Sequence, residues 1–180
     1  MPSFFIVGIV FLCMFLSCTD VESHKKEFKK GDFFLTKEHD SLYYLKISSG
    51  KHSDRWKLPY PVYQFHTGDI DNNGTDDALI GVIKSTRFDS TSDKRLFIFK
   101  NYKGLVRPLW LGSRLSQPLV NFGCYQDKDG TYIRSIEREK SGKYLVAEYK
   151  WRKFGLEFIR YLRREIDSTT ALTFLEEESF

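Results

Sequence analysis

The chain has 180 residues, which is enough for one domain of ordinary size. Its 41% hydrophobic and 29% charged residues are typical of a folded soluble domain. The net charge of +4 is modest and the basic residues are interspersed with acidic ones, so charge gives no indication of nucleic-acid binding. Aromatic residues make up 16% of the chain, which favours β-strands and large contributions to a core.

The N-terminus begins with an uncharged, mostly apolar run over residues 3–17. That length suits the apolar region of a signal peptide and is short for a membrane-spanning helix. The run ends in Phe15-Leu16-Ser17-Cys18, which resembles the lipobox of bacterial lipoproteins, where a small residue precedes the lipidated cysteine. We therefore predict a lipoprotein signal peptide over 1–17 and lipidation of Cys18. An uncleaved membrane helix and an ordinary secretory signal are the alternatives.

The residues after Cys18 indicate where in the cell envelope the predicted lipoprotein would be located. Thr19 stands where an inner-membrane retention signal of enteric bacteria has Asp, which favours the outer membrane. Asp20 and Glu22 resemble the acidic surface-export signals of Bacteroidetes lipoproteins, so both the periplasmic and the surface-exposed side stay open. Residues 18–31 are predicted to form the lipid anchor and a flexible, lysine-rich tether. The membrane, through this anchor, is the first predicted partner.

From residue 32 onwards, short runs of β-branched and aromatic residues alternate with turn sequences, and no segment shows sustained helical periodicity. This pattern predicts an all-β domain over 32–166. The predicted strands are 32–36, 42–47, 56–58, 62–66, 78–84, 95–100, 105–111, 118–122, 132–138, 143–151 and 156–163.

An acidic turn followed by a series of strands recurs along this domain. It occurs over Asp69–Leu111, again over Asp127–Arg163, and in reduced form over Asp32–Phe65. The recurrence predicts about three blade-like antiparallel sheets, a partial propeller-like arrangement, with a sandwich or a barrel as the alternative. The last segment, 167–180, is predicted to be a polar, disordered tail.

The acidic loop over residues 69–77 has the composition of a calcium site. Calcium takes six to eight oxygen ligands, and ligands spaced two apart in a turning loop converge on one point. Asp69, Asp71 and Asn73 have that spacing, and Gly74 permits the sharp turn. Thr75 can offer its backbone carbonyl, and Asp77 stands at the ninth place.

These five residues are the predicted ligands of one structural Ca²⁺ ion. The alternative is a bare polar turn at Asn72-Asn73-Gly74, which needs no metal.

The loop differs from an EF-hand, because Ile80 occupies the twelfth place, where that motif has Glu, and a strand pattern follows instead of a helix. It resembles the FG-GAP/VCBS repeat, whose pattern Asp-x-Asp-x-Asp/Asn-Gly-x-x-Asp precedes an apolar strand. Asp69, Asp71, Asn73, Gly74 and Asp77 match this pattern, and Leu79 is the first large apolar residue after it. The resemblance implies the calcium loop of an integrin-type β-propeller blade, although a full propeller has several such loops and only one is clear here.

Several other residues are candidates for function. Asp127-Lys128-Asp129-Gly130 looks like an eroded copy of the metal loop. Cys124 is expected to be a free, buried thiol, and His66 a polar residue at a strand end. The large aromatic residues, Trp56 and Tyr60 among them, are expected to pack in the core. A sugar-stacking platform is the alternative, with Trp56 and Tyr60 as its exposed pair. The basic run from Lys150 to Arg164 is expected to form a solvated sheet face, with an anionic ligand as the alternative.

These observations predict a lipid-anchored, exported β-domain that acts as a binding or assembly module at the cell envelope. An envelope protein or a glycan is the expected partner, and nucleic acid is not. No catalytic residue is predicted. The rival hypotheses are a hydrolase of envelope or extracellular polymers and a scaffold subunit of a membrane complex.

Overall fold

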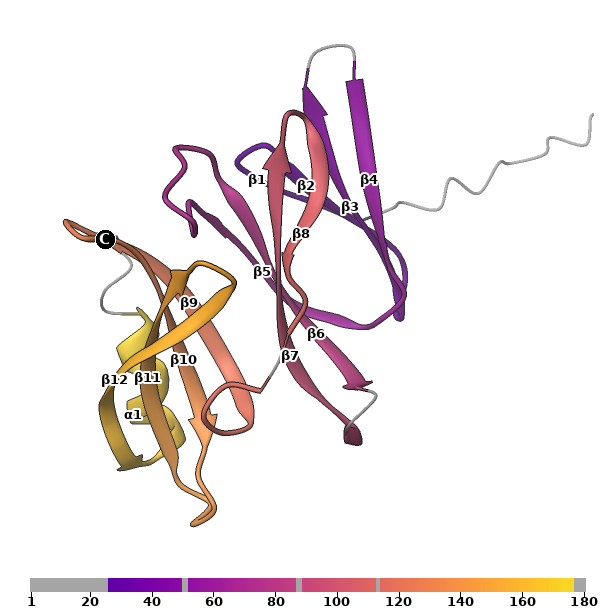
Figure 1. The fold of residues 1–180 in the computed structure, drawn as a ribbon. Helices are drawn as coiled ribbons and strands as arrows, with labels where there is room; N and C mark the ends of the chain where they lie inside the picture. Colours follow the sequence, from indigo (N-terminus) through magenta and orange to yellow (C-terminus); the bar gives the residue numbers. More distant parts are fainter. Residues whose placement is uncertain (1–25, 50–51, 87–88, 113, 177–180) are drawn as a thin grey trace, which may run out of the picture.

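A computed structural model describes residues 26–49, 52–86, 89–112 and 114–176. They form three four-stranded antiparallel sheets and one helix (Figure 1). The first sheet contains β1 (Lys26–Lys30), β2 (Phe33–His39), β3 (Leu42–Ser49) and β4 (His52–Leu58). The second contains β5 (Val62–Gly68), β6 (Asp77–Thr86), β7 (Asp89–Tyr102) and β8 (Leu105–Trp110). The third contains β9 (Leu119–Asp127), β10 (Gly130–Arg138), β11 (Tyr144–Arg152) and β12 (Gly155–Ile166), followed by α1 (Ser168–Glu176).

Each strand pairs with its neighbours in sequence, so every sheet is a meander. Short turns make this possible: Tyr102 pairs with Leu105 across Lys103 and Gly104, whose φ angles are 55° and 80°. Two positive φ angles in a two-residue loop match the twist of the strands that it joins. The predicted all-β fold with three blade-like sheets is thus confirmed, and none of the sheets closes on itself.

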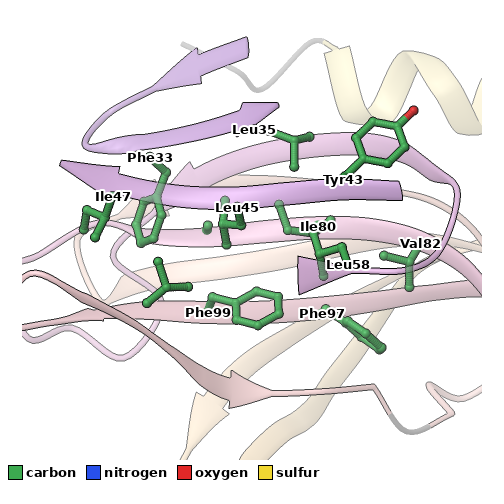
Figure 2. Close-up of a cluster of buried hydrophobic side chains, with 12 residues drawn as sticks. Phe33, Leu35, Tyr43, Leu45, Ile47, Leu58, Ile80, Val82, Phe97 and Phe99 are labelled. Atoms are coloured by element: carbon green, nitrogen blue, oxygen red, sulfur yellow. The ribbon is translucent and has the colours of Figure 1, made fainter. Parts of the chain in front are cut away.

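The second sheet is buried on both faces. Ile80, Val82 and Phe99 point toward the first sheet, where they pack with Phe33 and Leu45 (Figure 2). The alternate residues of the same strands point toward the third sheet, where they pack with Phe122, Ile133 and Leu145. Successive side chains of a strand point to opposite faces, so a sheet covered on both faces requires a continuous apolar run. The sequence Ala78-Leu79-Ile80-Gly81-Val82 is that run.

The outer faces of the first and third sheets differ: a helix covers the third sheet, and charged side chains cover aromatic rings on the first. On the third sheet, α1 packs Ala171, Phe174 and Leu175 against a third cluster that includes Ile136 and Val146. On the first sheet, Lys29 lies over the Phe34 ring at 5.2 Å and Arg55 over the Tyr44 ring at 5.1 Å. Such cation–π pairs leave the charged ends in water.

Three sequence-based expectations are wrong in detail. The predicted tether ends in a strand, because β1 pairs its backbone with β2 although all its side chains are exposed. The predicted disordered tail contains α1, whose start is capped by Asp167, which accepts hydrogen bonds from the Thr170 amide (3.0 Å) and hydroxyl (2.8 Å). The polar stretch that begins at Asp89 is part of β7, since it pairs with β6.

The expected boundaries between the sheets are also shifted. The acidic loop lies inside the second sheet, between its first and second strands, and not at its start. The reason is that β5 and β6 pair with each other across the loop, with Gly68 opposite Asp77. The signal peptide over 1–17 and Cys18 lie outside the described residues.

The core between the first two sheets gives a direct test of the layered arrangement. Phe99 is fully buried there against Trp56, at 5.6 Å between ring centroids. We expect Phe99→Ala to lower the free energy of unfolding by about 3–5 kcal/mol, because it leaves a cavity between two sheets. Urea denaturation followed by circular dichroism measures this loss.

The matched control is Phe154→Ala, because Phe154 is 92% exposed in the β11–β12 turn. It is expected to change stability by less than about 0.5 kcal/mol. Equal effects of the two substitutions would contradict the packing of the first sheet on the second.

Candidate metal centre

The metal loop, defined here as residues 69–77, joins β5 to β6 as a wide hairpin. It brings carboxylate oxygens of Asp69, Asp71 and Asp77 within 4.8 Å of one another. Pairing of Gly68 with Asp77 closes the base of the hairpin, so Asp69 and Asp77, which are eight apart in sequence, become neighbours. Among the described residues this is the one such group of three potential metal-ligating side chains.

Hydrogen bonds within the loop hold its shape. Asp69 accepts from the backbone amides of Asn73 (2.9 Å) and Gly74 (2.8 Å). The Asn73 side-chain oxygen accepts from the amide of Thr75 (2.9 Å) and also from its hydroxyl. Asn72 and Gly74 have φ angles of 55° and 85°, which make the sharp turn. The loop therefore presents its acidic residues in a fixed arrangement.

Of the five predicted ligands, the structure brings together the carboxylates of Asp69, Asp71 and Asp77. Asn73 and Thr75 lie in the same loop and bond to each other. The Asn73 oxygen that sequence reasoning assigned to the metal is thus engaged within the loop.

Two oxygen atoms in this group are buried without a partner. Asp77 is fully buried, and its Oδ2 accepts from the Ile70 amide at 3.0 Å, whereas its Oδ1 has no hydrogen-bond partner. Oδ1 of Asp71 is likewise buried and unpartnered. Buried polar atoms are nearly always satisfied, and leaving one unsatisfied costs about 1–3 kcal/mol. A cation between these carboxylates would satisfy both oxygens, and a bare turn would not.

The electrostatics agree with this arrangement. Burial, with the neighbouring Asp71 carboxylate as the second cause, raises the pKa of Asp77 to about 7. Three carboxylates in one small volume repel one another unless a cation neutralises them. All the converging atoms are oxygens, which suit hard cations such as Ca²⁺ and Mg²⁺. Three carboxylates from one protein loop favour Ca²⁺, because Mg²⁺ keeps several waters and uses one or two carboxylates.

The metal loop also contacts the other two sheets. A Cβ atom on Gly31, in the β1–β2 turn, would lie 2.6 Å from a carboxylate oxygen of Asp76. A Cβ on Gly130, in the β9–β10 turn, would lie 2.6 Å from the side-chain oxygen of Asn72, and the Thr131 amide donates to that oxygen at 3.3 Å. The turns between the first and second strands of all three sheets thus meet (Figure 1).

The β9–β10 turn is the Asp127–Gly130 segment that looks like an eroded metal loop. It occupies the equivalent position in the third sheet, as expected of a repeat. Asp127 pairs with Gly130, and the Asp127 side chain accepts from the Asp129 amide at 2.8 Å. The segment is a tight two-residue turn, which is too short to form a loop like the metal loop.

Two candidate reactive residues near the loop are held in non-reactive states. Burial, with the charge of Lys30 as a lesser cause, lowers the pKa of His66 to about 4, and its ring packs on Phe122 at 5.6 Å. Burial raises the pKa of Cys124 to about 12, so this free thiol stays protonated. Cys124 is a free thiol, as expected, but it is half-buried against Gly68 and not fully buried.

The aromatic and basic candidates are also explained by packing. Trp56 and Tyr60 are partly buried and pack against Phe99 and Phe97, which agrees with the expected core packing. Arg160, from the basic run, pairs at 2.7 Å with Glu148, which is 1% exposed.

Glu148 anchors a larger network. Burial by itself raises the pKa of this carboxyl, but hydrogen bonds from Tyr125, Arg160 and Arg134 outweigh it and lower the pKa. The basic run therefore serves in part to neutralise a buried acid.

Sequence reasoning missed two further features. Glu137 is fully buried and accepts from Ser116, Gln117, Ser135 and Tyr149, which fixes the segment between the second and third sheets. The lysines of β1 and β2 border a groove, and they were missed because β1 was assigned to the tether.

Comparison with protein-family models, with curated proteins and with solved structures gives no match. The resemblance to FG-GAP/VCBS repeats thus stays a prediction based on the loop. In the described part of the chain, no helix has the length and apolar character needed to cross a membrane.

Substitution of Asp77 by Asn distinguishes a metal site from a bare turn. Asn has the same shape and can keep the bond from the Ile70 amide, but it removes a buried charge beside Asp71. Without calcium, Asp77→Asn is expected to raise the melting temperature at pH 7.5. With saturating calcium, the melting temperature of Asp77→Asn is expected to fall below that of wild type, because a calcium ligand is lost. Thermal unfolding with calcium and with EGTA measures both.

The control is Asp76→Asn, an equal charge change at an exposed neighbour outside the triad. It should keep the calcium-dependent stabilisation. The metal site would be contradicted if the same protein, Asp77→Asn or wild type, had the higher melting temperature both with calcium and with EGTA.

Metal-free protein should also lose stability as the pH rises. The pKa of Asp77 is about 7 when folded and about 3.8 when unfolded, so the folded state holds a proton that the unfolded state has released. The stabilisation is present below pH 3.8 and is lost as the pH rises through 7. The pKa difference corresponds to at most about 4 kcal/mol. Urea midpoints between pH 5 and 8 should fall in wild type and stay flatter in Asp77→Asn.

Proposed function

We propose that this protein is a lipid-anchored, exported β-domain of a bacterial cell envelope, stabilised by one calcium ion, that serves as a binding or assembly module. The observation that carries the calcium part is the pair of buried, unpartnered oxygens on Asp71 and Asp77. They lie in a group of three carboxylates that a hard cation would neutralise.

The place of the metal loop supports a structural role for the ion. The loop contacts the turns at Gly31 and Gly130, which belong to the first and third sheets. A cation that fixes the loop would therefore stiffen the point where all three sheets meet. Sites of this kind in extracellular proteins bind calcium with dissociation constants of roughly 10⁻⁴–10⁻³ M, which suffices where calcium is plentiful.

The anchoring part of the proposal rests on the lipobox-like sequence before Cys18. Cys18 precedes β1 by eight residues, a span of at most about 28 Å when extended. The first sheet would then lie close to the outer membrane, on its periplasmic or its external side.

A hydrolase is less well supported. Its candidate residue, His66, has a lowered pKa and packs on Phe122. A binding module is compatible with a role as a subunit of a larger membrane complex, with a protein or glycan as partner.

The calcium part is tested by thermal unfolding of wild type and Asp71→Ala, with calcium and with chelator. At free calcium about 100 times the dissociation constant, binding to the native state adds about 2.7 kcal/mol, or roughly 5–11 °C in melting temperature. Asp71→Ala should abolish this shift. Asp129→Asn, which changes an acid of the neighbouring turn, should keep it. No shift in wild type would remove the metal from the proposal.

The anchoring part is tested by metabolic labelling with a radioactive fatty acid in a bacterial host. Wild-type protein should carry the label and sediment with membranes. Cys18→Ser should lose the label, because its hydroxyl is not a substrate for thioether lipidation, while Cys13→Ser should keep it. Equal labelling of wild type and Cys18→Ser would refute lipidation at this residue.

A further inference from the structure

A groove of about 440 Å³ lies between the first and second sheets. One wall is formed by β1 and its partner β2, and the other by β5. Its apolar lining includes Phe28, Leu35, Val62 and Phe65. Phe28 is 40% exposed, so part of its ring is open to solvent in the groove.

The groove runs along two strand edges. Consecutive residues line it on each side, from Phe28 to Lys30 on β1 and from Val62 to Phe65 on β5. Successive side chains of a strand point to opposite faces, so consecutive lining residues mean that the edge itself borders the groove. Both strands are outermost among the strands that the structure describes, where β1 pairs with β2 alone and β5 with β6 alone. An unpaired strand edge is a template for pairing with another chain.

The charge of the groove has one sign. Lys26, Lys29, Lys30 and Lys37 border it, and none of the described residues that line it is acidic. The acid of β1, Glu27, is engaged elsewhere, because it accepts from Thr36 at 3.0 Å on the opposite face. Within the described residues, Lys37 pairs with the exposed Asp40. For the other lysines that border the groove, the described part of the chain supplies no carboxylate in contact, and Glu27 lies 3.9 Å from Lys46, which is outside the groove.

We propose that this groove binds an extended acidic segment of a partner protein, which adds as a strand to the free edge of β1. Carboxylates of the segment pair with Lys26 and Lys30, and its apolar side chains contact Phe28 and Val62. Five residues of β1 extend about 17 Å, so the bound segment has about five residues. This names the partner class of the binding module proposed above and rests on the binding part of that proposal.

A peptide fits better than an anionic lipid surface. Lipid headgroups pair with lysines but leave the backbone groups of a strand edge unsatisfied. Strand addition uses main-chain hydrogen bonds for affinity and alternate side chains for specificity, which matches a groove with two free edges and a mixed apolar and basic lining.

The test uses the full-length protein in non-ionic detergent and a fluorescent eight-residue peptide of alternating Glu and Val. Fluorescence anisotropy should show binding that weakens with salt. Lys26→Glu combined with Lys30→Glu should weaken it by about tenfold or more. Two equal charge changes at exposed sites outside the groove, Lys140→Glu combined with Lys143→Glu, should change it less than about twofold.

Strand addition has its own readout. Amide hydrogen exchange should slow in β1 when the peptide binds, because its edge groups become paired. A peptide with N-methyl groups on alternate residues has the same charge but cannot donate along one edge, and it should bind far more weakly. Equal binding of the methylated peptide, or of an alternating Lys and Val peptide, would overturn the proposal.

Two further outcomes separate this inference from the calcium proposal. Retention by phosphatidylglycerol vesicles that is lost in the Lys26→Glu, Lys30→Glu variant, without any peptide binding, would assign the groove to a membrane surface and overturn the inference. The calcium-dependent melting shift should be unchanged in the Lys26 and Lys30 variant. Failure of peptide binding with an intact calcium-dependent melting shift would therefore contradict the groove proposal and leave the metal proposal standing. A missing melting shift with intact peptide binding would contradict the metal proposal and leave the groove proposal standing.

Discussion

Burial of the second sheet on both faces is the constraint on which the rest of the structure depends. Its strands place Ile80 and Phe99 against the first sheet and Leu79 and Ile98 against the third. Neither outer sheet has a second apolar face to offer, because one outer face is charged and the other is covered by α1. The three sheets therefore form a short stack, in which the charged face and α1 act like the polar caps of a repeat protein.

The metal loop lies at one edge of this stack, where it contacts turns of the first and third sheets. Apolar layers alone fix the distance between sheets, but they do not fix the relative rotation of the sheets well, since dispersion contacts are non-directional. The hydrogen bond from the Thr131 amide to Asn72 is directional, and Gly130 and Gly31 allow Asn72 and Asp76 to approach the neighbouring turns closely. A cation bound by Asp69, Asp71 and Asp77 would hold these contacts in place, which is why a structural ion suits this position better than a catalytic one.

The stack also leaves strand edges open. The first strand of each sheet lies at an edge of that sheet. The edge strands β5 and β9 are connected, because the Gln64 side chain of β5 donates a hydrogen bond to the Phe122 carbonyl of β9 at 2.6 Å. The edge strands β1 and β5 are separated by a groove with four lysines. Lysines on an edge protect it from pairing with identical chains, because like charges repel, and the same lysines favour an acidic partner.

The all-β class, most of the strand positions and the acidic loop can be predicted from the amino-acid sequence, because these features depend on local properties. Alternation of apolar residues, Gly turns such as Lys103-Gly104 and ligand spacing in Asp69-x-Asp71 are all visible within a few residues.

Only the tertiary structure decided which carboxylates converge, since Asp77 reaches Asp71 through strand pairing and Asn73 turns to Thr75 instead. It also decided that Lys26–Lys30 is a strand, because pairing with β2 satisfies a backbone whose side chains carry no apolar pattern. The burial of Asp77, and with it the raised pKa, likewise comes from packing between sheets that are distant in sequence.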